Sequence, residues 1–382
     1  MRIRSLGPLA KLSVPALLLV LAGCGTNNAN SNNNQSGGCS GCSFVYATTN
    51  DGQLLTFPAQ TGGALGTPAT TPGAPDSAYV SAPTPGNTFY VADSQNNAID
   101  AFYANENNGT ATAIGTVSLG TGPGSPAGIL QLNGYLYVGD TNGTISVLGA
   151  GGTGLTPISG SPFQAGGEPL NLATASVAAL YGPNVSVLYS ADFTGGAISG
   201  FTIESDGSLL TIPGFPTLTP PNGAPTEMYV GSSSNGGILY VALSGLNEIE
   251  AFNIVESTGE LVPLTGSPFA AGRAPVSLAG YHSFLYALNS LDHTISGYTM
   301  DPNTGALTEI AGSPFAAGTA AAGLISGFDG ALYVPDTQSN AVLGFSVNTT
   351  TGSLTPLAGS PFPAIGGPVA LTSVFFQILT PP

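Results

Sequence analysis

The sequence predicts an all-β protein that folds as a seven-bladed β-propeller with four-stranded antiparallel blades, and three observations support this. A strand ending in an apolar residue followed by Tyr recurs seven times. Apolar residues and turn residues keep a fixed spacing after each of these tyrosines. The two ends of the folded region supply complementary parts of one repeat. A closed ring of small sheets satisfies all three, because each repeat packs against two neighbours.

The recurring tyrosines set the length of the repeat. They are 44 to 52 residues apart, and a period of roughly 40 to 50 residues is typical of four-stranded propeller blades. The apolar-Tyr pairs are Val45-Tyr46, Phe89-Tyr90, Leu136-Tyr137, Leu188-Tyr189, Leu239-Tyr240, Leu285-Tyr286 and Leu332-Tyr333. We call the strand that contains each pair strand B.

A second strand, strand C, follows each Tyr after turn residues that favour a hairpin, such as 94–97. It carries a branched aliphatic residue and, three positions later, a large apolar residue: Leu54 and Phe57, Ile99 and Phe102, Ile145 and Leu148, Ile198 and Phe201, Ile249 and Phe252, Ile295 and Tyr298, Val342 and Phe345. The constant offset indicates that all seven units share one hairpin.

Strand D opens with a Gly-x-Leu step in four units, at 207–209, 259–261, 305–307 and 352–354. Four units then continue with Gly-Ser-Pro-Phe, at 160–163, 266–269, 312–315 and 359–362. Proline cannot donate to a strand ladder, so this segment belongs at a strand end or edge. An apolar strand after Pro or Ala, such as 275–280, is strand A of the next blade.

The ends of the repeat region predict how the ring closes. The region opens at Phe44 directly on a strand B, and 367–374 has the pattern of a strand A. Both ends therefore complete one blade, which leaves few open sheet edges. An extended solenoid is the alternative architecture, but it would need capped ends.

The first 23 residues predict a lipoprotein signal peptide. Arg2, Arg4 and Lys11 form a positive region, and the apolar stretch 12–21 is too short to span a bilayer. The stretch ends in Leu-Ala-Gly-Cys, which resembles a bacterial lipobox, so Cys24 would be lipidated; an ordinary signal peptide with an incidental Cys is the alternative. The residue directly after Cys24 is Gly25 and not an acidic residue, which favours the outer membrane or periplasm over the inner membrane.

Residues 24–43 form the predicted tether between the lipid and the folded domain 44–382, because they are rich in Asn, Ser and Gly and contain no core-forming residue. Cys39 and Cys42 lie there as a Cys-x-x-Cys pair. A redox or metal role would need a βαβ context or a second ligand pair. In an exported protein a local disulfide, or two idle thiols, is the simpler interpretation.

Charge excludes one class of partner. After residue 23 the chain has one basic residue, Arg273, against 20 Asp and Glu, a formal charge of −19. Proteins bind nucleic acids through several Lys and Arg on phosphates, so we exclude a nucleic-acid partner. We expect a monomer whose partner is the membrane through its lipid, with an envelope protein or a small molecule as its ligand.

The repeats, with units such as LYVAD, AISGF, TGALT and GSPF, resemble the lactonase-type seven-bladed propellers over residues 44–382. That group includes bacterial 6-phosphogluconolactonases, fungal muconate-lactonizing enzymes and YVTN-repeat surface proteins. The resemblance implies lactone hydrolysis, with Arg and His residues in a central cavity for anionic substrates. This chain has one Arg and two His after residue 23, so no catalytic residue can be transferred from the family.

Four blades carry Asp three residues after the Tyr: Asp93, Asp140, Asp192 and Asp336. These carboxylates could form a ring that binds a cation such as Ca²⁺, the only cofactor that the sequence suggests. The alternative is that Asp is favoured at the start of a turn, where it accepts hydrogen bonds from nearby backbone.

Arg273, Asp292 and His293 are the candidate catalytic residues. Arg273 lies between strands D and A, and the other two lie in the next B–C turn, so all three should open on one face of one blade. Together they could polarise a carbonyl and activate a water molecule. The alternative is an exposed turn without function.

The composition therefore predicts a binding or assembly module of the cell envelope, with a lactonase or ester hydrolase as the alternative and a Ca²⁺-stabilised propeller as a third hypothesis. A channel lined only by Ser, Thr, Asn and apolar groups would favour the binding module. Convergence of Arg273, Asp292 and His293 at the channel mouth would favour the hydrolase.

Overall fold

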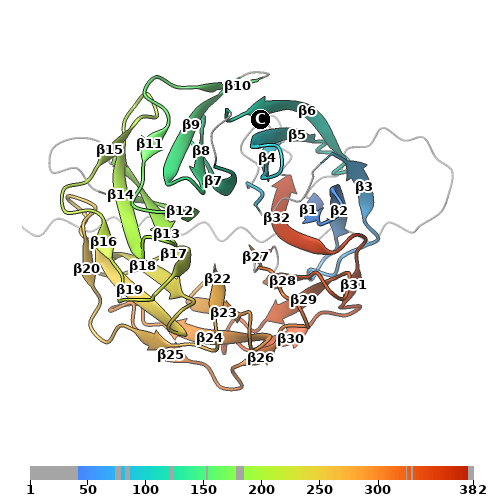
Figure 1. Cartoon of the computed structure of the whole chain (residues 1–382). Coiled ribbons are helices and arrows are strands. Elements are labelled where there is room, and N and C mark those ends of the chain that lie inside the picture. Colours follow the sequence, from blue (N-terminus) through green and yellow to red (C-terminus); the bar gives the residue numbers. More distant parts are fainter. Residues whose placement is uncertain are drawn as a thin grey trace, which may run out of the picture.

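The computed structural model describes residues 42–73, 79–81, 87–120, 124–151, 154–177, 185–323, 325–327 and 330–376. These residues form seven antiparallel sheets arranged like blades around a central axis (Figure 1). No helix lies in the described ranges. The prediction of an all-β propeller with seven blades is confirmed.

Strands A lie nearest the central axis and strands B pair with them (Figure 1). Strands A are β7 (Pro126–Leu132), β12 (Pro169–Val177), β17 (Pro225–Ser233), β22 (Pro275–Tyr281), β27 (Ile325–Ser326) and β32 (Pro368–Phe376). Strands B are β1 (Cys42–Thr49), β4 (Thr88–Asp93), β8 (Tyr135–Asp140), β13 (Val185–Asp192), β18 (Gly236–Leu243), β23 (Phe284–Asn289) and β28 (Ala331–Asp336). In the second blade, residues 79–81 pair with β4 in place of a strand A.

Strands C and D complete the blades toward the outer rim. Strands C are β2 (Gln53–Ala59), β5 (Ala98–Ala104), β9 (Thr144–Gly151), β14 (Ala197–Ile203), β19 (Glu248–Ile254), β24 (Thr294–Met300) and β29 (Ala341–Val347). Strands D are β3 (Ala69–Pro72), β6 (Ala111–Ser118), β10 (Gly154–Pro157), β15 (Leu209–Thr211), β20 (Leu261–Pro263), β25 (Leu307–Glu309) and β30 (Leu354–Pro356). Five blades add a short fifth strand: β11 (Phe163–Gln164), β16 (Thr217–Leu218), β21 (Phe269–Ala270), β26 (Phe315–Ala316) and β31 (Phe362–Pro363).

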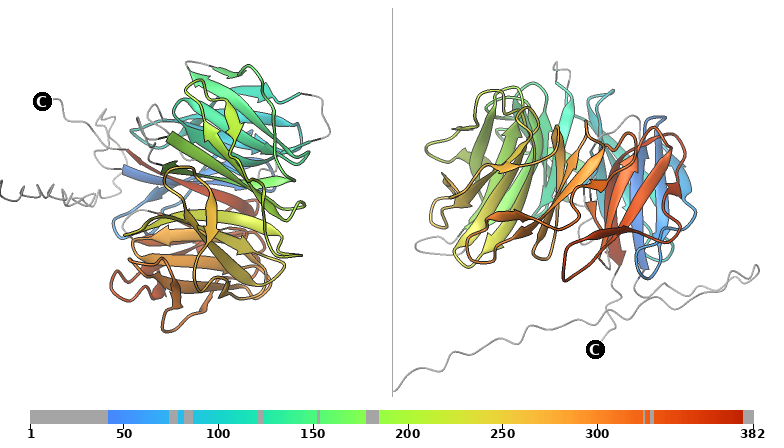
Figure 2. Two further views of the ribbon diagram at one scale, coloured as in Figure 1. Left: turned by 90° about the vertical axis from the view of Figure 1, so that its left-hand side faces the viewer. Right: turned by 90° about the horizontal axis from the view of Figure 1, so that it is seen from below.

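The two ends of the domain close the ring within one blade, as predicted. β1 pairs antiparallel with β32, with Tyr46 opposite Thr372. The two strands lie side by side although they are more than 300 residues apart in sequence (Figure 2). Closure gives each of these strands a partner in place of an open edge.

The recurring tyrosines of strand B join each blade to the next. Each of these tyrosines is buried, and in six of the seven blades the hydroxyl donates to the carbonyl of a glycine in the C–D turn of the following blade. The pairs are Tyr46 to Gly109, Tyr137 to Gly207, Tyr189 to Gly259, Tyr240 to Gly305, Tyr286 to Gly352 and Tyr333 to Gly63. One hydrogen bond thus satisfies a buried polar group on each side of a blade interface.

The Gly of the Gly-x-Leu step is required by conformation as well as by this contact. Gly259 has a φ of 77°, which side-chain-bearing residues rarely adopt. A Cβ at this position would lie 2.9 Å from Val187 Cγ1 of the preceding blade. The same glycine therefore starts strand D and lets the blades approach closely.

The Gly-Ser-Pro-Phe repeat has a structural role in the blade edge. Its Ser hydroxyl oxygen accepts a hydrogen bond from a strand C backbone N–H at 2.8 to 3.0 Å, in the pairs Ser161 with Val147, Ser267 with Ala251, Ser313 with Gly297, and Ser360 with Gly344. The following Phe then enters the short fifth strand. The serine replaces a ladder partner where strand D is interrupted, and the Pro lies at the edge as predicted.

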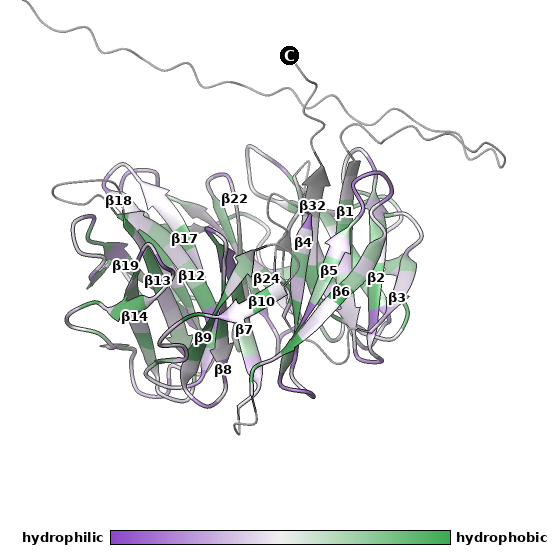
Figure 3. Cartoon of the chain, turned by 90° about the horizontal axis from the view of Figure 1, so that it is seen from above, coloured by the Kyte–Doolittle hydropathy of each residue, from purple (hydrophilic) through white to green (hydrophobic). Residues whose placement is uncertain are grey.

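The hydrophobic core is divided among the spaces between neighbouring blades. Each cluster combines residues of adjacent sheets, such as Tyr286 and Leu332, or Tyr189 and Leu239. Hydrophobic residues follow the strands, while hydrophilic residues concentrate in the turns at both faces (Figure 3). Several side chains that face the central axis lie outside these clusters. They can therefore vary without disturbing the packing between blades.

Candidate functional site

Arg273 and Asp292 lie on the same face of the propeller and share a hydrogen bond. This bond uses the backbone of Arg273 and not its side chain. The Asp292 carboxylate accepts a hydrogen bond from the Arg273 backbone N–H at 2.6 Å. Arg273, Asp292 and His293 are all exposed. Within the described residues, the Arg273 side chain forms no ion pair and His293 makes no side-chain hydrogen bond to the other two. The expected shared face is confirmed, whereas a catalytic role for the three stays a prediction.

The four Asp residues lie buried at the ends of their strands B, and each is held by its own blade. Asp140 accepts from Ser146 Oγ at 2.8 Å, and Asp192 accepts from Ser199 Oγ at 2.5 Å. Burial raises the pKa of both carboxyls, and these serine hydrogen bonds oppose the rise.

The remaining two carboxylates follow the same arrangement. Asp93 accepts from the backbone and the side chain of Asn96, and Asp336 accepts from the backbone N–H groups of Thr319 and Ala320. The described residues contain no group of three or more His, Cys, Asp or Glu placed to hold one metal ion. The local hydrogen bonds agree with the turn interpretation, and Ca²⁺ binding stays an untested prediction.

The predicted lipidation and disulfide sites fall at the edge of the structure. Cys24 and Cys39 lie outside the described residues, and Cys42 is the first residue of β1. In the part of the chain that the structure describes, no helix is long and apolar enough to cross a bilayer.

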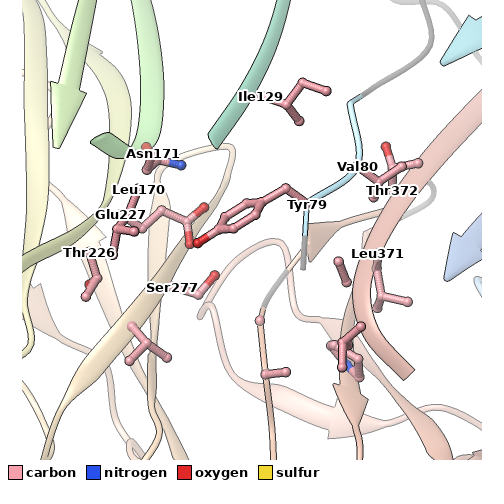
Figure 4. Close-up of a pocket in the computed structure, with 16 residues that line it drawn as sticks. Tyr79, Val80, Ile129, Leu170, Asn171, Thr226, Glu227, Ser277, Leu371 and Thr372 are labelled. Atoms are coloured by element: carbon pink, nitrogen blue, oxygen red, sulfur yellow. The ribbon is translucent and has the colours of Figure 1, made fainter. Parts of the chain in front are cut away.

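A central cavity of about 620 Å³ lies among the innermost strands (Figure 4). Residues from β7, β12, β17, β22, β32 and the segment 79–81 line it. Nine of the described lining residues are apolar, and six have polar side chains: Tyr79, Asn171, Thr226, Glu227, Ser277 and Thr372. A volume of this size is typical of small-molecule sites.

Four of the six polar residues occupy the same register position of the blade. In β7, β12, β22 and β32 this residue lies opposite the penultimate residue of strand B. Glu227 takes the same place in β17, directly before Met228, which pairs with Val241. In blade order the position holds Tyr79, Gly128, Asn171, Glu227, Ser277, Gly323 and Ala370. A bulge precedes this residue in several strands A; bulges re-aim side chains next to functional sites. Six of these seven residues, all except Gly128, line the central cavity.

Glu227 is the acidic member of this ring. Its Oε2 accepts a hydrogen bond from the Leu278 backbone N–H at 3.2 Å. Burial raises the pKa of its carboxyl to about 7, while hydrogen bonds from Ser277 and Leu278 partly oppose that rise. The side chain is half-buried because it faces the cavity while protein surrounds it on its other sides. At neutral pH the carboxyl is therefore divided between its protonated and ionised forms.

Asn171 and Tyr79 flank Glu227. Asn171 Oδ1 accepts from the Met228 backbone N–H at 3.1 Å, which orients the amide nitrogen toward the cavity (Figure 4). The Tyr79 ring extends across the cavity with its hydroxyl toward the Glu227 carboxylate (Figure 4). Burial and the negative charges of Glu227 and Glu168 raise the pKa of Tyr79 to about 12, so its hydroxyl keeps its proton and can donate it in a hydrogen bond.

The cavity contains no basic side chain among the described residues that line it. After Lys11 the chain has no Lys or Arg other than Arg273, and neither Arg273 nor either His belongs to the lining. A channel lined only by Ser, Thr, Asn and apolar groups would have favoured a binding module, but Glu227 and Tyr79 also line this cavity. Arg273, Asp292 and His293 also do not converge in it.

Sequence reasoning missed Tyr79, Asn171, Glu227 and Ser277. The signal was present at Glu227, an ionisable residue in the otherwise uncharged strand PTEMYV. A charged residue in the innermost strand of a propeller must face either the axis or a neighbouring blade. The catalytic residues predicted from the sequence lie in turns between strands, where binding residues usually occur.

Comparison with known proteins gives a family model and partial sequence relatives. The family model described as "Lactonase, 7-bladed beta-propeller" matches residues 44–371. The chain is 36% identical over 98 residues to a 6-phosphogluconolactonase of Pectobacterium atrosepticum. That match covers 25% of this chain and 27% of the relative, so it spans about a quarter of the relative's length.

Solved structures agree in fold. A Pseudomonas aeruginosa periplasmic gluconolactonase superposes with a TM-score of 0.69 at 16% identity, covering 87% of this chain and 99% of that one. A Bacteroides fragilis protein assigned as a 6-phosphogluconolactonase gives a TM-score of 0.70 at 19% identity, covering 88% of this chain and 98% of that one. At these identities the likeness shows the fold alone.

Proposed function

Because the chain belongs to the lactonase family of seven-bladed β-propellers, we propose that it hydrolyses a small lactone in the central cavity, with Glu227 as the group that activates water. One observation carries the proposal: a carboxyl with a pKa of about 7 faces a cavity large enough for a small molecule. A general base works best when its pKa lies near the working pH.

The ionised Glu227 carboxylate accepts a proton as a water molecule attacks the lactone carbonyl carbon. The carbonyl oxygen gains negative charge in this step, and the Asn171 amide and the Tyr79 hydroxyl, which flank Glu227 in the cavity, are the donors assigned to it (Figure 4). Donors placed for this charge lower the barrier in a partly dehydrated site.

The ring carbon–oxygen bond then breaks as Glu227 returns its proton to the leaving oxygen. The product is the open hydroxy acid, and the carboxylate is restored. Ser277 and the Leu278 N–H bind the carboxylate, so they orient it and oppose too large a rise of its pKa.

A non-catalytic binding module of the cell envelope is the second candidate. It is favoured by the exposed position of Arg273, Asp292 and His293, which removes the residues first considered for catalysis from the cavity. In this case the same cavity binds its ligand without turnover.

We also propose that the protein is exported and held in the cell envelope by lipid on Cys24. The support is the lipobox-like end of the signal peptide and the periplasmic location in the name of one similar protein. Replacing Cys24 by Ala should move the protein from the membrane fraction to the soluble fraction, whereas Cys39→Ala should not.

The catalytic proposal is tested by hydrolysis of a panel of uncharged lactones by the full chain and by Glu227→Gln. We expect the variant to lose between about 10²-fold and 10⁴-fold of kcat/KM, the usual contribution of a general base. Glu260→Gln, which removes an exposed carboxylate, is the matched control and should keep full activity.

Two outcomes would contradict this proposal. If the wild-type chain hydrolyses no lactone while a lactone analogue binds in the cavity, the protein is a binding module. If the Arg273→Ala, His293→Ala double variant loses activity and Glu227→Gln keeps it, the site lies on the exposed face.

A further inference from the structure

The walls of the central cavity differ in character. Asn171, Glu227 and Ser277 form a polar arc that comes from the adjacent strands β12, β17 and β22. The facing wall carries mostly apolar side chains, with Val80 and Leu371 on the far side of the cavity from Glu227 and Thr372 beside Val80 (Figure 4). A molecule that fills the cavity therefore meets polar groups on one side and mostly hydrocarbon on the other.

Most polar atoms of the arc already have protein partners. Asn171 Oδ1 accepts a hydrogen bond from the Met228 backbone N–H. Thr226, the neighbour of Glu227 on β17, donates its Oγ1 hydroxyl to the Pro275 carbonyl at 3.1 Å. Ser277 bonds to Glu227. A sugar lactone brings several hydroxyl groups, and each loses free energy if it leaves water without a partner. The cavity has donors enough for a lactone carbonyl but few remaining partners for a polyol.

The apolar wall offers surface that a ligand can cover. Val80, Ile129 and Val369 are only half-buried, since part of each side chain faces the cavity. Covering such surface with hydrocarbon is favourable in proportion to the area removed from water. The polar arc fits the lactone ring and the opposite wall fits a hydrocarbon substituent.

Charge excludes a phosphorylated ligand. Phosphate sites use several cations, preferably bidentate Arg, whereas the described lining has none and holds the Glu227 carboxylate. Moving a phosphate dianion next to an ionised carboxylate in a partly dehydrated cavity is strongly unfavourable.

We propose that the cavity takes an uncharged lactone carrying an alkyl or aryl substituent, and that it discriminates against hydroxylated and phosphorylated sugar lactones. This inference rests on the proposed function for the identity of the ring. The assignment of the hydrocarbon to the wall that includes Val369 comes from the lining itself.

The test measures binding of non-hydrolysable lactams to the full chain by calorimetry at pH 7.5 or thereabouts, so that it does not depend on turnover. The probes are δ-valerolactam, its 6-ethyl and 6-propyl derivatives, glucono-δ-lactam and its 6-phosphate. Affinity should rise about fourfold for each methylene that becomes buried. Both sugar lactams should bind more weakly than the unsubstituted ring.

A matched pair of variants places the substituent. Val369→Thr keeps the shape of a cavity side chain but replaces a methyl group by a hydroxyl, and should remove most of the affinity that the propyl group adds over the unsubstituted lactam. Val262→Thr makes the same change on the exposed surface of β20 and should have no effect.

Tighter binding of either sugar lactam than of the propyl lactam would overturn the inference, and so would equal affinities along the alkyl series. Alkyl-lactam binding without hydrolysis of the corresponding lactone would leave the inference standing and overturn the proposed hydrolysis. Hydrolysis of a gluconolactone in preference to alkyl lactones would support the proposed hydrolysis and overturn the inference about the substituent.

Discussion

The interfaces between blades and the ring of residues around the axis follow opposite rules. At the interfaces, six of seven blades use the same contact, a Tyr hydroxyl donating to a Gly carbonyl of the next blade. At the axis, the equivalent positions hold Tyr79, Gly128, Asn171, Glu227, Ser277, Gly323 and Ala370. In this propeller, repetition specifies the fold, and departure from repetition marks the candidate site.

The closing interface gives the strongest test of the repeated part. Removing residues 368–382 takes away β32, the partner of β1, and leaves an unpaired edge in the ring. We expect the full chain to unfold in a single cooperative transition in calorimetry, and the shortened chain to lose that transition. Removing only residues 377–382 is the control and should leave the transition in place. A shortened chain that melts like the full one would contradict closure through β32.

The next largest effect is the pH dependence of hydrolysis, which tests Glu227 in the ring of residues around the axis. With a pKa of about 7 for Glu227, kcat/KM for lactone hydrolysis should be low at pH 5, rise through pH 7 and level off above pH 8, because only the ionised base accepts a proton. A pH–rate profile of the wild-type chain measures this. Glu227→Gln should show no such step in its residual activity; a retained step near pH 7 would assign the titration to another group.

A single repeated interface contact should have an intermediate effect. Tyr240→Phe removes the hydroxyl that donates to the buried Gly305 carbonyl at 2.6 Å, and an unsatisfied buried acceptor costs about 1–3 kcal/mol. Urea unfolding should show this loss without a change in lactone hydrolysis. Tyr103→Phe is the control, since Tyr103 is 39% exposed; equal stability of the two variants would mean that the Tyr–Gly contacts do not stabilise the ring.

Glu250 is a departure from repetition inside an interface, and its effect should be the smallest. It lies on strand β19 opposite Val241, and its Oε2 is buried without a hydrogen-bond partner among the described residues. The equivalent residue is Ser in three other blades, such as Ser199, Leu in two, such as Leu343, and Asp100 in the sixth, where Thr116 Oγ1 donates to the carboxylate. Burial and the nearby charge of Glu248 raise its pKa to about 7.

Because the folded-state pKa of Glu250 lies above its ordinary value of 4.5, the folded state holds the proton more tightly than the unfolded state between pH 4.5 and 7. Its contribution to stability therefore falls as the pH rises through that window. Glu250→Leu should raise the free energy of unfolding at pH 8 by about 1–2 kcal/mol, less than the full shift because the side chain is partly exposed. The gain should shrink at pH 5, and exposed Glu260→Leu should show neither effect.

The sequence predicted the parts of this protein that depend on local chemistry. The seven Tyr-containing strands, the turns after them and the closure between 44 and 374 follow from alternating apolar residues, glycine and proline, whose conformational preferences act over a few residues. The prediction that the D–A connection of Arg273 meets the turn of Asp292 was also correct, because strand order fixes which turns share a face.

The candidate site could not be read from the sequence in the same way. Tyr79, Asn171, Glu227 and Ser277 lie in four different blades, up to 198 residues apart in the chain, and none belongs to a motif. Arg273 and His293 are rare residue types in this chain, yet the rarity of a residue type carries no information about its distance from the axis. Their exposure in the structure separates them from the cavity.

The sequence by itself determined the propeller, the number of its blades and its acidic character, since each arises from repeated local patterns or from composition. Only the tertiary structure decided which of the strand residues face one another across the axis. That depends on the bulge in strand A and on closure of the ring, which together bring the Glu227 carboxyl out of water and raise its pKa. Burial of this kind is a property of the assembled ring, because no single blade can enclose a group at its edge.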